Sequence, residues 1–111
     1  MKELLDGLVL ELRRGVLILG VLSQLNEKEY GYSLIQKLQD HQFEIEAGTL
    51  YPLLRRLEKQ GLLESSWELI DNRPRRYYQI SDEGRKLYNS LKQEYQSLNT
   101  MMNQLIQGEK Q

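Results

Sequence analysis

The sequence has 111 residues and a formal net charge of −1, with 40% hydrophobic and 28% charged residues. This length fits a single domain, and the composition is that of an ordinary soluble globular protein. Cysteine is absent, which excludes disulfides and thiolate metal sites, and residues 1–22 lack both a signal-peptide pattern and an uninterrupted apolar span. We therefore expect a cytoplasmic protein with no membrane contact.

The basic side chains are concentrated in one part of the chain. Residues 1–46 carry five basic and eight acidic side chains, whereas residues 47–61 carry three basic and one acidic. Residues 62–80 carry three basic and three acidic side chains, but the three basic ones are arginines that lie within four consecutive positions. A locally basic face is enough for counterion-release binding to DNA, so the weak net charge does not exclude this partner.

The first predicted element is a long helix. Apolar residues recur in steps of three and four over Leu4–Leu25, and this spacing predicts one helix that ends near Asn26. It has two apolar faces, so we expect one to pack on the domain core and the other on a second subunit. A shorter helix is predicted over Gly31–His41, and after it Phe43 and Ile45 are expected to point inward.

A third helix is predicted to begin near Ala47–Thr49. Pro52 constrains this start, because proline is tolerated in the first helical turn and breaks a helix interior. Gly61 follows where a left-handed C-terminal cap is expected. The predicted buried stripe of this helix consists of four leucines, Leu50, Leu53, Leu54 and Leu57.

Two segments of alternating character, Leu62–Ile70 and Arg75–Ile80, predict a β-hairpin. Asn72 between them tolerates a positive φ angle, and Pro74 suits the edge of a short strand. We interpret Trp67 as packing within this hairpin rather than as a platform for a ligand.

A long C-terminal helix is predicted from Ser81, which can cap its first turn, to about Gln107. Asp82 and Glu83 complement the positive end of its dipole. Apolar residues then follow in steps of four and three, as in a coiled-coil seam. Because little of the domain is left for the far end of this helix to cover, we expect it to pack against another chain.

Together these elements predict a mainly helical α+β fold, a winged helix-turn-helix whose long N- and C-terminal helices form a dimer interface. We expect residues 1–111 to form one domain, with the winged helix over about residues 10–81. A dimerisation helix over about residues 82–107 then packs with the N-terminal helix over residues 3–25. The residues expected at the dimer interface are Leu5, Leu8, Leu12, Leu91, Tyr95, Leu98, Met102 and Leu105.

The predicted third helix has the side chains that a DNA-recognition helix needs. Such a helix presents polar and basic groups from its exposed N-terminal half to the major groove. Thr49, Tyr51 and Arg55 can do so while the leucines face inward. The hydroxyl groups suit hydrogen bonds to phosphates or base edges, and an arginine can contact guanine or phosphate.

The predicted hairpin adds three arginines, Arg73, Arg75 and Arg76, which we expect to contact phosphates or to reach the minor groove. Arg73 has the strongest reason to face DNA, because we expect it to lie in the turn itself. For Arg75, an ion pair with an acidic side chain inside the fold is an open alternative.

Nothing in the sequence indicates catalysis. His41 is the only histidine, no cluster of histidines and carboxylates has metal-ligand spacing, and no glycine-rich phosphate loop is present. No serine or carboxylate nucleophile has a visible base partner. We therefore expect no enzymatic activity, no metal and no cofactor.

Several motifs match a known pattern at the right separations: Gly31-Tyr32, Gly48–Leu63, Trp67, Arg73–Ser81 and Gly84. Over roughly Val16–Leu87 the chain resembles the PadR family of bacterial transcriptional regulators, with Gly48–Leu63 similar to the third helix of that family. The single terminal helix resembles the short subfamily.

The resemblance implies a homodimer whose winged helices enter two DNA half-sites, usually repressing a nearby gene until an effector binds. Some members take small aromatic or hydrophobic compounds between the terminal helices. We therefore hypothesise a DNA-binding transcriptional regulator, a repressor on a pseudo-palindromic operator, with double-stranded DNA, a second copy and such an effector as partners. One alternative is a winged-helix module that binds protein instead of DNA, which the weak net charge favours. Another is a small-molecule sensor whose output is DNA release.

Overall fold

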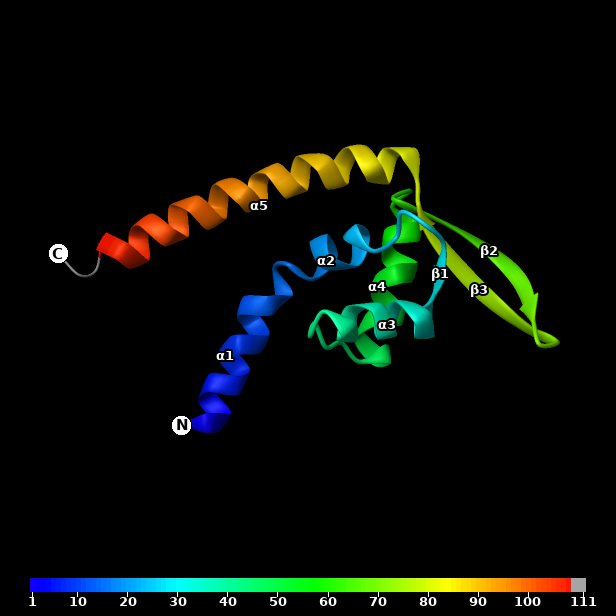
Figure 1. The fold of residues 1–111 in the computed structure, drawn as a ribbon, viewed down its shortest axis with the longest axis horizontal. Coiled ribbons are helices and arrows are strands. Elements are labelled where there is room, and N and C mark those ends of the chain that lie inside the picture. Colours follow the sequence, from blue (N-terminus) through cyan, green and yellow to red (C-terminus); the bar gives the residue numbers. More distant parts are fainter. Residues whose placement is uncertain (109–111) are drawn as a thin grey trace.

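The computed structural model describes residues 1–108 and arranges them as helices to one side of a small antiparallel sheet, whose hairpin projects outward (Figure 1). The elements are α1 (Lys2–Arg14), α2 (Leu17–Ser23), β1 (Glu29–Tyr30), α3 (Gly31–Asp40), α4 (Ala47–Lys59), β2 (Leu63–Ile70), β3 (Arg73–Ile80) and α5 (Asp82–Gly108). The winged helix-turn-helix predicted from the sequence is confirmed: α3 and α4 form the helix-turn-helix, and the β2–β3 hairpin forms the wing.

The N-terminal segment forms two helices, so the single helix predicted over Leu4–Leu25 is wrong. The chain turns at Gly15–Val16, where the Val16 amide donates to the carbonyl of Arg13 at 3.1 Å, only three residues back. Glycine costs about 1 kcal/mol relative to alanine in a helix interior, which favours a break here. α1 buries no residue whereas α2 joins the core, so the packing of the domain holds α2 but not α1. We call the turn at Gly15–Val16 the elbow. The apolar spacing of the sequence continues through it, so this spacing does not show that α1 ends there and that a second helix begins.

The hydrophobic core lies between α2, α3, α4 and the base of the sheet. All four leucines of the stripe predicted for α4 belong to it, which confirms that prediction. Phe43 and Ile45 pack against its edge and are half-buried, as expected. The residues with the most completely buried side chains are Val21, Leu22, Leu25, Leu34, Leu50, Leu54 and Leu57.

The sheet has the strand order β1-β3-β2, with antiparallel pairing throughout. The sequence did not predict β1, because two residues are too few to show alternation. The wing is longer than predicted: Arg73 already pairs with Ile70 across the hairpin. Asp71 and Asn72 connect the strands with positive φ angles of 52° and 62°, as a two-residue hairpin loop of type I′ requires.

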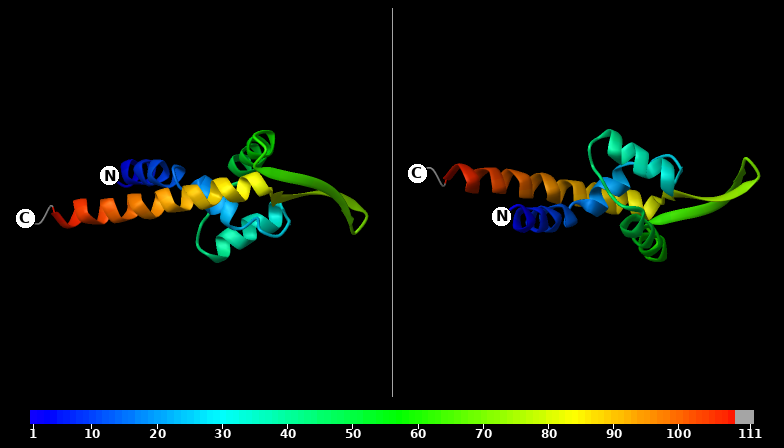
Figure 2. Two further views of the ribbon diagram at one scale, coloured as in Figure 1. Left: turned by 90° about the horizontal axis from the view of Figure 1, so that it is seen from above. Right: turned by 90° about the horizontal axis from the view of Figure 1, so that it is seen from below.

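Ser81 caps α5, as predicted. Its Oγ accepts a hydrogen bond from the Gly84 amide at 2.9 Å and donates one to the carbonyl of Gly61 at 2.7 Å. α1 and the far half of α5 leave the domain on the side away from the wing (Figure 2). Within residues 1–108, every helix is too short or too polar to cross a membrane.

Gly84→Ala is expected to lower the free energy of unfolding by about 1–3 kcal/mol or more, as overpacking does. A Cβ atom at this position would lie 2.1 Å from the carbonyl oxygen of Leu62 and 2.9 Å from Cγ1 of Ile80. The carbonyl oxygen of Leu62 belongs to the backbone, so a change of side-chain rotamer cannot relieve this clash. Urea denaturation at matched protein concentration measures the loss. Gly48→Ala is the control, because a Cβ there meets nothing within 4 Å and α4 lies outside the predicted dimer interface; equal stability of both variants would contradict the steric argument.

Candidate nucleic-acid interface

α4 has an exposed polar side opposite its leucine stripe. Because successive helical residues are turned by about 100°, Tyr51 and Arg55 lie about 40° apart, whereas Thr49 lies about 160° from Tyr51. Tyr51 and Arg55 are both exposed, Tyr51 at 37%. The structure thus brings these two predicted contacts together and places Thr49 on the other edge of the helix.

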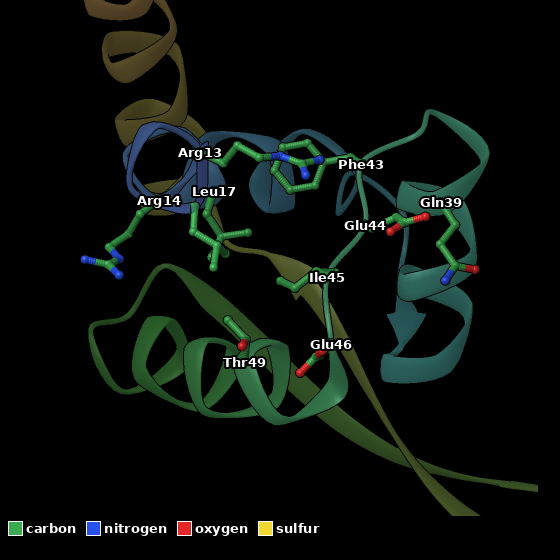
Figure 3. Close-up of a pocket in the computed structure, with 10 residues that line it drawn as sticks. Arg13, Arg14, Leu17, Gln39, Phe43, Glu44, Ile45, Glu46 and Thr49 are labelled. Carbon is green, nitrogen blue, oxygen red and sulfur yellow. The ribbon is translucent and has the colours of Figure 1, made fainter. Parts of the chain in front are cut away.

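Thr49 lines a groove of about 710 Å³ between α4 and the elbow that joins α1 to α2 (Figure 3). On the far wall, the guanidinium carbon of Arg13 lies 5.3 Å from the centre of the Phe43 ring. Arg14 and Arg56 line the adjoining part of the groove with Thr49. Sequence reasoning missed Arg14 as a neighbour of α4, because the elbow that brings it there was not predicted.

Tyr51 is held in place by a glycine that lies twenty positions earlier in the chain. Gly31 begins α3 and is buried. A Cβ atom on it would lie 2.1 Å from Cε1 of Tyr51 and 2.5 Å from its hydroxyl oxygen. Gly31 therefore gives the tyrosine ring the room to pack against the start of α3 in the position that the structure shows.

The three wing arginines lie in different surroundings. Arg73 is exposed beside the turn. Arg75 is half-buried, with its guanidinium carbon 4.7 Å from the centre of the Tyr30 ring, and its Nε atom is buried without a hydrogen-bond partner. Tyr30 in turn meets Tyr77 edge to face, at 5.5 Å between ring centres. Arg75 thus belongs to an aromatic cluster, and within residues 1–108 it forms no ion pair of the kind considered from the sequence.

Arg76 points to α4 rather than to the wing tip. Its Nη2 lies 2.7 Å from Oε1 of Glu58, and its Nε donates to Oγ of Ser65 at 3.2 Å. The guanidinium also lies over the rings of Trp67 and Tyr78, at 5.8 and 5.5 Å from their centres. Burial raises the pKa of the Tyr78 hydroxyl, and the Arg76 charge partly offsets this rise. The DNA contact expected of Arg76 stays a prediction, and in the structure this side chain has partners inside the fold.

Comparison with known proteins places this geometry in one family. The family model described as "Transcriptional regulator PadR-like family" matches residues 18–90, which is more than half of the chain. The chain belongs to the PadR family. Its helix-turn-helix and wing fall within the matched residues.

Relatives named as transcriptional regulators are similar to this chain over most of their length. Transcriptional regulator Rv3488 of Mycobacterium tuberculosis is 33% identical over 100 residues, which cover 89% of this chain and 91% of the relative. The crystal structure of a PadR family transcriptional regulator from Eggerthella lenta is 46% identical, with a TM-score of 0.89 and coverage of 95% and 94%. A PadR-like regulator from Bacillus cereus is 34% identical, with a TM-score of 0.78 and coverage of 87% and 97%. The chain is therefore a transcriptional regulator and not an enzyme.

The terminal helices of this PadR-family chain expose a large apolar surface. Among the described residues, α1 buries none and α5 buries only Gly84. Leu12 is 77% exposed and Leu105 is 63% exposed. A concentration of exposed apolar side chains on two helices is typical of an interaction site. The predicted interface residues therefore stay as a prediction, with Leu91 half-buried and the other seven exposed: Leu5, Leu8, Leu12, Tyr95, Leu98, Met102 and Leu105.

Proposed function

We propose that this PadR-family regulator is a repressor that binds a pseudo-palindromic operator as a homodimer. The observation that carries the proposal is the placement of two cationic side chains. Arg55 on α4 and Arg73 at the wing tip are exposed, and within residues 1–108 neither takes part in an ion pair. In the proposed complex α4 enters the major groove with Tyr51 and Arg55, Thr49 contacts phosphate from the other edge, and Arg73 reaches the flanking backbone.

A second copy of the chain supplies the second half of the proposed DNA-binding surface. The exposed apolar residues of α1 and α5 support this, because they have no partner within the described part of the chain. α5 has 27 residues, which corresponds to a length of about 40 Å at 1.5 Å per residue. A twofold axis through these helices places two copies of α4 on one duplex, with half-sites about 34–36 Å apart.

An effector that enters between the terminal helices is part of the proposal. Tyr95, Met101 and Met102 are exposed on α5, and methionine side chains adapt readily to different apolar ligands. A compound that separates the terminal helices also changes the distance between the two copies of α4. We expect such a compound to raise the melting temperature of the protein and to weaken operator binding, because it favours the DNA-free arrangement.

Arg73→Ala is expected to weaken DNA binding by a similar factor for all sequences. If each Arg73 contacts a phosphate, a dimer that lacks both contacts has a salt-dependence slope smaller by about two. Fluorescence anisotropy of a labelled duplex at several salt concentrations measures this slope. Lys86→Ala on α5 removes the same charge away from the wing and serves as control. An unchanged slope for Arg73→Ala would remove this residue from the proposed interface.

The proposed function is tested by binding to a duplex that carries the region upstream of the regulator's own gene. The proposal predicts that the association constant falls steeply as salt increases, because several phosphates are neutralised. A nearly flat dependence would contradict it and would favour the alternative, a winged-helix module that binds another protein.

A further inference from the structure

An acidic side chain lies on the helix that we propose to enter the major groove. Glu58 is near the C-terminal end of α4, seven residues after Tyr51 and on the same edge of the helix. An unpaired carboxylate at this place would repel DNA phosphates. Both of its oxygens are engaged, however: Oε1 accepts from Nη2 of Arg76 at 2.7 Å, and Oε2 accepts from Oγ of Ser65.

The partners of Glu58 come from both strands of the wing. Ser65 is on β2 and Arg76 is on β3, and Nε of Arg76 donates to Oγ of Ser65 at 3.2 Å. Trp67 pairs with Arg76 across the two strands, and its ring lies beneath the same guanidinium. We call Glu58, Ser65 and Arg76 the Glu58 bridge. Within residues 1–108 it contains the one ion pair between α4 and the wing.

The other face of the wing is tied to a different part of the chain. Glu68 pairs with Lys28 near β1, and Arg75 lies over the ring of Tyr30. These contacts fix the wing to the segment before α3, but they do not fix it to α4. The angle between α4 and the wing therefore depends on the Glu58 bridge and on the packing at the base of the sheet.

We infer that Glu58 and Arg76 are positioning residues, which hold the wing at the angle to α4 that lets both contact one duplex. Neither side chain contacts DNA in this arrangement, and the inference rests on the proposed function. Arg73 lies three residues beyond Arg76 along β3, or roughly 10 Å at about 3.3 Å per residue. A tilt of about 10° at the bridge moves the tip by roughly 2 Å, which is enough to break a hydrogen bond to phosphate.

The first test needs no DNA. Trp67 is the only tryptophan of the chain and lies under the Arg76 guanidinium, so its fluorescence reports on the bridge. In Glu58→Gln, we expect a lower steady-state anisotropy and a shifted emission maximum, with unchanged helix content in circular dichroism. Glu83→Gln is the matched control, because it breaks an exposed ion pair with Lys86 on α5. Unchanged Trp67 fluorescence in Glu58→Gln would overturn the inference.

The second test is a double-mutant cycle between Glu58 and the wing tip, which do not touch. We expect Glu58→Gln to weaken operator binding about tenfold in the wild-type background, and less than about twofold when Arg73→Ala has already removed the tip contact. An equal loss in both backgrounds would overturn the inference, since Glu58 would then act without the wing. A gain in affinity would also overturn it, because Glu58 would then act only by repelling phosphates. Absence of salt-dependent binding by the wild-type protein would instead refute the proposed function, and the Trp67 result would still decide whether the bridge holds the wing.

Discussion

Leu98→Asp is expected to convert the proposed homodimer into a monomer and to weaken operator binding by at least about a hundredfold. Leu98 lies midway along α5 and is 53% exposed in the single chain. In the proposed dimer it is buried against the second copy, where an unpaired carboxylate costs several kcal/mol. Loss of the dimer makes the two half-site contacts independent, and this removes an avidity gain on the order of 10²–10⁴. Sedimentation velocity measures the mass, and anisotropy titration measures the affinity.

Gln93→Asp is the matched control for Leu98→Asp. It introduces the same charge on the same helix, about 140° away from Leu98 around its axis. We expect this variant to stay dimeric and to bind the operator as the wild type does. A Leu98→Asp protein that is still a dimer would place the interface elsewhere, and a monomer with undiminished operator affinity would show that dimerisation is not needed for binding.

Arg55→Ala is expected to have the second largest effect, and to act on sequence discrimination. Arg55 is exposed on α4 and has no ion-pair partner within residues 1–108. If Arg55 forms two hydrogen bonds to one guanine, its removal costs each copy about 1–3 kcal/mol of discrimination between the correct and the wrong base. Over two half-sites this is about 2–6 kcal/mol, so the ratio of operator affinity to affinity for an unrelated duplex falls by at least roughly thirtyfold.

Arg56→Ala separates base contact from a general loss of charge. Arg56 follows Arg55 directly, but it lines the groove with Thr49 and Arg14. We expect its removal to weaken binding to operator and unrelated duplex by the same factor. If Arg55→Ala also leaves their affinity ratio unchanged, Arg55 contacts phosphate and α4 reads the operator through other residues.

Much of the fold could be predicted because its signals are local. The leucine stripe of α4 follows from the spacing of four leucines, and the wing follows from alternation on each side of Asn72. Ser81 caps α5 through atoms only three residues apart. Each of these features is decided within a few neighbouring positions, so one sequence is enough to find it.

Other features depend on contacts between distant residues and could not be predicted. The elbow at Gly15–Val16 arises because α1 and α2 have different surroundings, although the apolar spacing continues through both. The strand β1 forms only because β3 pairs with it.

The same difference between local signals and distant contacts explains why only part of the candidate site could be predicted. The exposure of Arg73 follows from its place beside a turn, and Arg55 follows from helical spacing. Arg76 alternates along its strand like any other residue, and its pairing with Glu58 appears only when the wing folds back on α4. Likewise, the packing of the Tyr51 ring against Gly31 joins two residues twenty positions apart, so neither residue predicts it alone.

Hydroxyl-radical footprinting of the upstream duplex tests the central claim most directly, when combined with the number of chains bound per duplex. The account predicts two chains on one site, with two symmetric protected regions whose centres lie about 10–10.5 base pairs apart, as expected for half-sites one turn apart. A single protected region bound by one chain, or two chains bound without a symmetric pattern, would contradict it.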